Sequence, residues 1–146
     1  MFKHFLIPTD GSSIATAAAS AGITLAQRLG AKVTAFYAIE ELHPIYIEGY
    51  VLNRSQRKGF EDRARIAAQK RLDAICRMAR AAGVPCASLV AAADSPYEGI
   101  IAAAKKRKCD VIFMASHGRR GLSRLFMGSV TQNVLSRATM PVVVFH

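Results

Sequence analysis

Residues 110–129, with the sequence DVIFMASHGRRGLSRLFMGS, decide the fold and carry the clearest functional signal in the chain. Residues 110–115 are almost continuously apolar, which is typical of a strand buried on both faces of a parallel sheet. A loop with several glycines follows them. Ser129 and Gln132 have the spacing of a capping box, so we expect a helix from Ser129 to about Arg137. The stretch therefore predicts a strand, a glycine-containing loop and a helix in succession.

The hydrophobic pattern of the remaining chain switches between the two-residue period of strands and the 3.6-residue period of helices. We expect further strands over residues 1–7, 32–39, 86–92 and 142–145. We expect further helices over residues 13–29 and 57–82, and one that Ser95, Pro96 and Glu98 open with a capping box. Strands alternating with helices predict one α/β domain over residues 1–146. Its Rossmann-like core would be an open five-stranded parallel sheet with helices on both faces.

Residues 40–56 form the one long segment without a regular pattern, and they include several apolar and aromatic residues. This length favours a lid or a contact surface over a plain connection. An apolar flap that packs on its own domain fits the sequence equally well. The sequence leaves both interpretations open.

The formal net charge of +10 is the unusual bulk property of the chain, and it favours anionic partners in general. Much of this charge lies between Arg54 and Arg80, where a solvated helix face explains it. Aromatic residues are not interleaved with the basic ones, so we do not expect nucleic acid as a partner. No apolar run reaches the roughly 18 residues of a membrane span, and the N-terminal residues lack the pattern of a signal peptide. We therefore expect a cytoplasmic protein without membrane contact.

The three cysteines, Cys76, Cys86 and Cys109, are an odd number at wide spacings, and none forms a C-x-x-C pair. This arrangement indicates neither a disulfide framework nor a zinc site. We expect the cysteines to pack as small buried apolar residues. The histidines show no ligand spacing either, so we expect no metal site in the protein itself.

Ligands of open parallel sheets bind beyond the carboxyl ends of the strands, where the strand order reverses. Two loops with suitable chemistry lie there, residues 8–13 after the first strand and residues 116–129 after the fourth. Glycines let the second loop approach a ligand closely, and the first amides of the following helix lack helical partners. Arg119, Arg120 and Arg124 add positive potential. The loop predicts an anion site that suits a phosphate, and the alternative is a glycine-containing loop with an ordinary helix cap.

Several motifs of known enzymes are missing. The chain has no G-x-x-x-x-G-K-[ST] and no G-x-G-x-x-G after its first strand, which argues against a P-loop NTPase and a dinucleotide dehydrogenase. It has no G-x-S-x-G elbow that would activate a serine. Asp10 is the one acidic residue at a strand end that we expect in the cleft, and it has no evident partner to position water. We therefore assign no catalytic residue.

Four stretches of the chain resemble the universal stress protein family. They are LIPTDGS at 6–12, SHGRRGL at 116–122, MGSV at 127–130 and PVVV at 141–144. Together they extend across essentially the whole chain. The resemblance implies an adenine nucleotide alpha hydrolase-like fold, which agrees with the pattern of strands and helices above.

Members of this family that bind ATP carry a motif of glycine, two residues, glycine, nine residues, and then Gly-Ser or Gly-Thr. Gly118, nine residues and Gly128-Ser129 match its second part. Ala115 stands in place of the first glycine, where its methyl group could crowd the ribose or the adenine. Because most of the motif is present, the resemblance implies binding of ATP, or of ADP or AMP. Mg²⁺ would be held through the phosphates and water, since no carboxylate cluster is available.

The resemblance also implies which residues line the site. The adenosine would lie against Pro8, Thr9, Asp10, Ala38, Met114 and Ala115, and the phosphates against Gly118, Arg119, Gly128, Ser129 and Val130. His117 would either support the loop or contact a phosphate, and we favour support. Family members commonly form homodimers through the last strand, so Val142, Val143 and Val144 would pair with a second copy.

Three functions remain open. The first is an ATP-binding stress-response or signalling module with little or no catalysis. The second is a family member that does not bind nucleotide and acts through protein partners. The third is a slow ATPase. We favour the first because most of the glycine motif is present, and Ala115 is the residue that separates it from the second.

Overall fold

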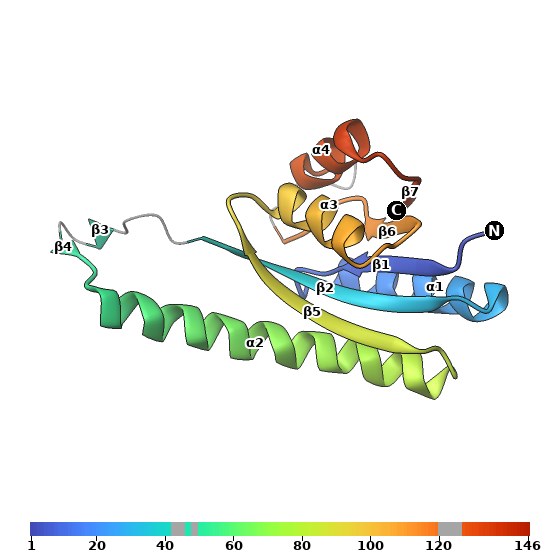
Figure 1. The fold of residues 1–146 in the computed structure, drawn as a ribbon, viewed down its shortest axis with the longest axis horizontal. Helices are drawn as coiled ribbons and strands as arrows, with labels where there is room; N and C mark the ends of the chain where they lie inside the picture. The colour runs from blue at the N-terminus through green and yellow to red at the C-terminus, as the bar shows by residue number, and fades with distance from the viewer. Residues whose placement is uncertain (42–45, 48–49, 120–126) are drawn as a thin grey trace.

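The computed structural model describes residues 1–41, 46–47, 50–119 and 127–146, and Figure 1 shows the arrangement of its elements. One sheet contains β1 (His4–Pro8), β2 (Lys32–Glu40), β5 (Cys86–Ala93), β6 (Val111–Ala115) and β7 (Val142–Phe145). The strands are ordered β5-β2-β1-β6-β7, and all of them pair in parallel. The predicted open five-stranded parallel sheet is confirmed.

Helices cover both faces of this sheet. Helices α1 (Ser13–Leu29) and α2 (Arg54–Ala81) pack on one face, and α3 (Pro96–Lys106) and α4 (Ser129–Arg137) pack on the other (Figure 1). Two short strands, β3 (Tyr46–Ile47) and β4 (Tyr50–Val51), form a separate antiparallel pair between β2 and α2. The molecule is therefore a three-layer α/β structure, as alternating strands and helices require.

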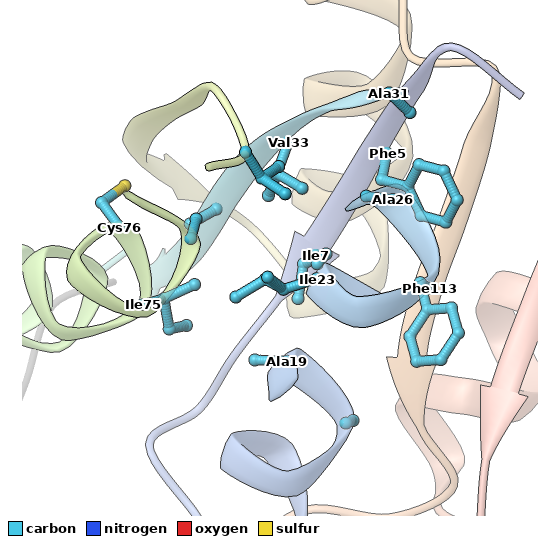
Figure 2. Close-up of a cluster of buried hydrophobic side chains, with 14 of the residues drawn as sticks. Phe5, Ile7, Ala19, Ile23, Ala26, Ala31, Val33, Ile75, Cys76 and Phe113 are labelled. Atoms are coloured by element: carbon cyan, nitrogen blue, oxygen red, sulfur yellow. The ribbon is translucent and has the colours of Figure 1, made fainter. Parts of the chain in front are cut away.

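The core on the α1 and α2 face consists of side chains from both helices and from alternate strand residues. Figure 2 shows Phe5, Ile7, Val33 and Phe113 from the strands beside Ala19, Ile23 and Ala26 of α1 and Ile75 and Cys76 of α2. Alanine and glycine let α1 lie close to the sheet: a Cβ atom on Gly22 would be 2.9 Å from Cδ1 of Ile7. Leu6, Phe36 and Ile112 point the other way and form the second core with α3 and α4. The central strands are thus buried on both faces.

Most predicted element bounds agree with the structure to within a few residues, and α1 agrees at both ends. Ser12 caps its start by accepting a hydrogen bond from the amide of Ala15 (3.2 Å), and Gly30 closes it with φ of +60°. The first strand begins at His4, not Met1, and β2 continues to Glu40. Helix α2 begins at Arg54, three residues before the predicted start, because Asn53 and Gln56 form a capping box.

Two predicted helix caps are wrong in detail. The hydroxyl of Ser95 donates to the carboxylate of Glu98 (2.8 Å) and does not cap the backbone of α3. The residue that caps α4 is Gly128, which has φ of −63° and ψ of 149°, and Ser129 is already helical. The amide of Gly128 donates to the carbonyl of Ser116 (2.8 Å). This contact fixes Gly128 as the capping residue, one position before the predicted cap at Ser129.

The predicted irregular segment 40–56 is shorter in the structure, because β2, β3, β4 and α2 take up part of it. Residues 42–45 and 48–49 lie outside the described part of the chain. Figure 1 shows the first half of α2, in green, extending beyond the other helices, and Phe60 and Ile66 on it are exposed. The interpretation of this region as a lid or a contact surface stays a prediction.

The amino ends of the strands carry most of the net charge. Exposed basic residues there include Lys3, Arg28, Lys32, Arg80, Lys105, Lys106, Arg107 and Lys108. We call these eight residues the basic edge. They lie at the strand starts, in the last turns of α1, α2 and α3, and in the turn before β6. Asp110 is the carboxylate among them, so this edge contributes +7 to the formal net charge of +10. Cations at helix carboxyl ends also offset the helix dipoles.

No helix in the described part of the chain is both long and apolar enough to cross a membrane.

Candidate nucleotide site

The candidate site lies where the strand order reverses. The chain passes from β1 to β2 and β5 on one side, and then returns to β6 and β7 on the other side of β1. The carboxyl ends of β1 and β6 are therefore neighbours, and the loops that follow them diverge to opposite faces of the sheet. This geometry brings together the two loops that the sequence analysis selected, and it is where ligands of such sheets bind.

The loop after β1 is held by its own polar groups. The amide of Gly11 donates to Oγ1 of Thr9 (3.0 Å), and the amide of Ser12 donates to Oδ1 of Asp10 (2.9 Å). Gly11 has φ of +79°, a conformation that side-chain-bearing residues rarely adopt. Pro8 is buried, and the amide of Thr9 continues the sheet by donating to the carbonyl of Phe36 (2.9 Å). Asp10 is thus fixed just beyond the carboxyl end of β1.

Asp10 also joins the two loops. Its Oδ2 accepts a hydrogen bond from the backbone amide of Arg119 (2.8 Å). Gly118 makes this approach possible, because a Cβ atom at that position would overlap the carboxylate of Asp10. Burial opposes ionisation of this carboxyl, but the hydrogen bonds from Ser12 and Arg119 outweigh it and lower the pKa of Asp10 below its usual value. The candidate site therefore contains an ionised carboxylate at neutral pH.

Sequence reasoning missed the residue that supports the loop after β1. One guanidinium nitrogen of Arg71, on α2, donates to the carbonyl of Asp10 (3.2 Å) and to the hydroxyl of Tyr37 (2.8 Å). The same guanidinium lies over the ring of Tyr37, 5.5 Å from its centroid. A Cβ atom on Gly11 would be 2.7 Å from Cδ of Arg71. Arg71 is one of many basic residues on α2, so nothing in the sequence distinguished it.

The loop after β6 is closed at its base. Besides the hydrogen bond from Gly128 to Ser116, the hydroxyl of Thr131 donates to the carbonyl of Ala115 (2.9 Å) and attaches α4 to the end of β6. A Cβ atom on Gly128 would be 3.2 Å from Cα of His117, so the two arms of the loop are in close contact. Thr131 is buried, and its role was not predicted.

The buried hydroxyl of Ser116 lies between two histidines. Its Oγ is 3.0 Å from Nδ1 of His117 and 3.0 Å from Nδ1 of His146, the last residue of the chain. The contact with Ser116 is consistent with the predicted supporting role of His117. His146 reaches this position because β7 ends beside β6, a pairing that spacing alone did not indicate.

The amino end of α4 is the part of the site suited to an anion. In the described residues, no backbone carbonyl pairs with the amides of Ser129, Val130 or Thr131. The side chain of Ser129 does not cap the helix, so capping does not engage its hydroxyl. Such amides, with the positive end of the helix dipole, favour negative charge. Gly121, Arg120 and Arg124 of this loop lie outside the described part of the chain.

The remaining predicted residues lie on β2 and β6, the two strands that flank β1. Ala38 is on β2, and Met114 and Ala115 form the end of β6. Met114 is buried on the α3 and α4 face, whereas the methyl group of Ala115 belongs to the core on the α1 and α2 face. The structure thus gathers the predicted adenosine and phosphate residues at one edge of the sheet.

A doubly wound α/β domain whose polar loops meet at its switch point has the architecture of many nucleotide-binding folds. The model of the universal stress protein family matches residues 1–146, and the chain belongs to this family. A universal stress protein of Thermus aquaticus is 31% identical over 143 residues, which cover 98% of each chain.

Solved structures agree with this assignment. The structure of protein MJ0577 superposes with a TM-score of 0.84 at 25% identity, covering 99% of this chain and 95% of that one. A universal stress protein in complex with cAMP gives a TM-score of 0.71 at 20% identity, covering 99% and 97% of the two chains. The universal stress protein from Archaeoglobus fulgidus in complex with dAMP gives 0.70 at 16% identity, covering 100% and 98%. The last two comparisons support the fold alone.

Proposed function

We propose that this chain is an ATP-binding stress-response or signalling module of the cytoplasm, with little or no catalysis. The observation that carries the proposal is the closed loop after β6. The hydrogen bond from Gly128 to Ser116 sets the amino end of α4 at the switch point, and Asp10 attaches the same loop to the end of β1. One edge of the sheet then offers both an anion site and a strand-end surface for a nucleoside.

Relatives support an adenine nucleotide as the ligand. Two solved family structures hold cAMP and dAMP, and both share the fold of this chain. In our proposal, the phosphates bind the amides of Ser129 and Val130 and the hydroxyl of Ser129, with Gly118, Arg119 and Gly128 around them. The adenosine lies against Pro8, Thr9, Asp10, Ala38, Met114 and Ala115. Mg²⁺ accompanies the phosphates and is held by them and by water.

Titration calorimetry with ATP, ADP and AMP in the presence of Mg²⁺, at physiological salt, tests the proposal. We expect saturable binding that Gly128→Val abolishes while the variant keeps its circular dichroism spectrum. A branched side chain at 128 would press on the backbone of His117, since even a Cβ atom would be only 3.2 Å from its Cα. No binding of any of the three nucleotides at millimolar concentration would favour a module that acts through protein partners.

Ala115→Gly tests whether the missing family glycine weakens binding. The methyl group of Ala115 packs in the core on the α1 and α2 face, so we expect the affinity for ATP to change by less than about threefold. Stability should fall by about 1 kcal/mol, because glycine loses more backbone freedom on folding. Calorimetry and denaturant unfolding measure the two effects. A much tighter complex would mean that the methyl group crowds the nucleotide.

Hydrolysis, where it occurs, should be very slow. Phosphoryl transfer needs a group that orients water in line with the γ-phosphate. Asp10 is the acidic residue of the described site, and its carboxylate is already hydrogen-bonded to Ser12 and Arg119. A steady-state rate near the typical enzyme value of about 10 s⁻¹ that Asp10→Asn removes would make the protein an ATPase.

We further propose a homodimer joined through β7. This strand lies at one edge of the sheet, and β6 is its one partner in the described structure. Its apolar sequence, Val142–Phe145, would otherwise leave an open edge of the kind that pairs with other chains.

A further inference from the structure

Two of the three cysteines lie against each other, far from the nucleotide site. Sγ of Cys76 and Sγ of Cys86 are 2.7 Å apart. Cys76 is on α2, close to its end at Ala81, and Cys86 is the first residue of β5. Residues 77–85 connect them and include a turn at Gly83 with φ of +69°. The fold, and not sequence adjacency, sets this contact.

Both cysteines are free thiols in this structure, and their sulfur atoms are closer than an ordinary packing contact would bring them. A disulfide bond is about 2.05 Å long. The two sulfur atoms, 2.7 Å apart, therefore need to approach by well under 1 Å. Cys109 is as buried as Cys76 but makes no contact with another cysteine in the described part of the chain, so it is an internal control.

We propose that Cys76 and Cys86 form a site of reversible oxidation, at which a hydroperoxide converts the two thiols to a disulfide that links α2 to β5. Cys86 is partly exposed and Cys76 is buried, so the oxidant reaches Cys86 first. The thiolate of Cys86 attacks one oxygen of the O–O bond and becomes a sulfenic acid. The other oxygen leaves with its substituent and, after protonation, is an alcohol or water. The thiol of Cys76 then attacks this sulfur and releases water. Two thiols lose two electrons and two protons, and the hydroperoxide accepts them.

The surroundings make this reaction slow. Burial, with the neighbouring Cys76 thiol, raises the pKa of Cys86 to about 12, so little thiolate exists at neutral pH. Once formed, the disulfide is shielded from solvent at Cys76, which is buried. The disulfide also constrains the unfolded chain and so raises the melting temperature.

Intact-protein mass spectrometry tests the proposal. Reduced full-length protein is treated with excess hydrogen peroxide and quenched in acid, and the remaining thiols are alkylated after unfolding. We expect a loss of two hydrogens, one alkylated cysteine per chain at Cys109, a Cys76–Cys86 cross-linked peptide, and full reversal by dithiothreitol. The oxidised form should melt a few degrees higher than the reduced form.

Two variants identify the pair. Cys86→Ser, at a partly exposed position, should lose the cross-linked peptide and the rise in melting temperature, and Cys76→Ala should behave alike. Cys109→Ala should keep both. Three alkylated cysteines after oxidation, a cross-link that includes Cys109, or a disulfide only between two chains would overturn the proposal.

Discussion

The absence of a side chain at Gly118 allows the loop after β1 and the loop after β6 to hydrogen-bond to each other. Its position leaves room for the carboxylate of Asp10 to reach the amide of Arg119. Any larger residue must displace that carboxylate from its hydrogen bond. The family motif places a glycine here, and the structure gives the physical reason in this chain.

Gly118→Ala should therefore break the bond between Asp10 and Arg119. We expect a loss of about 2 kcal/mol in unfolding free energy, typical of a hydrogen bond to a charged group. Nucleotide affinity should rise modestly, because the amide of Arg119 loses the internal acceptor with which a ligand competes. Gly59→Ala is the control, because Gly59 lies within α2 with the nearest atom to a Cβ at 3.8 Å, and alanine there should stabilise the helix. Urea unfolding and calorimetry measure both variants, and unchanged affinity in Gly118→Ala would show that the loop tolerates displacement.

Asp10 should also contribute to the pH dependence of stability. Its folded pKa is lowered, so its stabilising effect is fully present above the unfolded value near 3.8 and is lost as pH falls through the folded pKa. Asp10→Asn should remove this contribution, so wild type and variant should converge in stability at the acid end. Urea unfolding between pH 7 and pH 3 measures the difference. A gap that stays constant across this range would contradict the assignment.

At the scale of elements, the register of β7 decides which groups face outward. The amides of Ile112 and Ser116, on the β6 side, donate to the carbonyls of Pro141 and Phe145. The backbone groups of Pro141, Val143 and Phe145 therefore face β6. Because backbone groups alternate along a strand, Val142 and Val144 present theirs to the open edge. A proline substitution at 143 would therefore damage the sheet itself, and one at 144 would affect only the edge.

Val144→Pro should give a folded monomer. Proline lacks an N–H group and is tolerated on an edge strand where that group faces solvent. We expect light scattering to give twice the chain mass for the wild type and a single chain mass for the variant at micromolar concentration. Val143→Pro is the contrast and should melt at a markedly lower temperature. A monomeric wild type would rule out the proposed dimer.

Most elements could be predicted from the sequence because their signals are local. The apolar run of β6 and the alanine-rich stripe of α1, with Gly30 after it, fix those elements nearly to the residue. The predictions were wrong or incomplete where a contact between residues far apart in the sequence sets the structure. Gly128 replaces Ser129 as the cap of α4 because its amide reaches Ser116, and Arg71 joins the site only because α2 crosses behind the loop after β1. Neither contact has a signature in spacing or composition.

At the scale of the whole molecule, the basic edge and the ligand edge lie at opposite ends of the strands. The basic edge lies at the amino ends of the strands, opposite the crevice at their carboxyl ends. The sequence analysis placed much of the charge on α2 alone. The sheet collects cations from three helices and two strand starts into one surface, which a linear scan along the chain does not reveal.

This asymmetry should govern retention on a cation-exchange resin. Replacing both Lys105 and Lys108 with glutamine removes two charges from the basic edge. Replacing both Lys58 and Lys70, exposed residues of α2, removes the same number elsewhere. We expect the first variant to elute at clearly lower salt than the second, because a clustered surface engages the resin at several points. Equal elution would mean that net charge alone matters.

Because Asp10 and Arg119 are hydrogen-bonded to each other, a ligand that binds the amide of Arg119 must replace the carboxylate of Asp10. In the free protein this amide already has an anionic acceptor, tethered on the neighbouring loop and thus present at a high effective concentration. A small inorganic anion that needs this amide must compete with that acceptor through one contact only. A nucleotide makes contacts at several points and can offset the bond that it breaks. Asp10 would then act as an internal competitor that keeps the empty crevice selective for larger ligands.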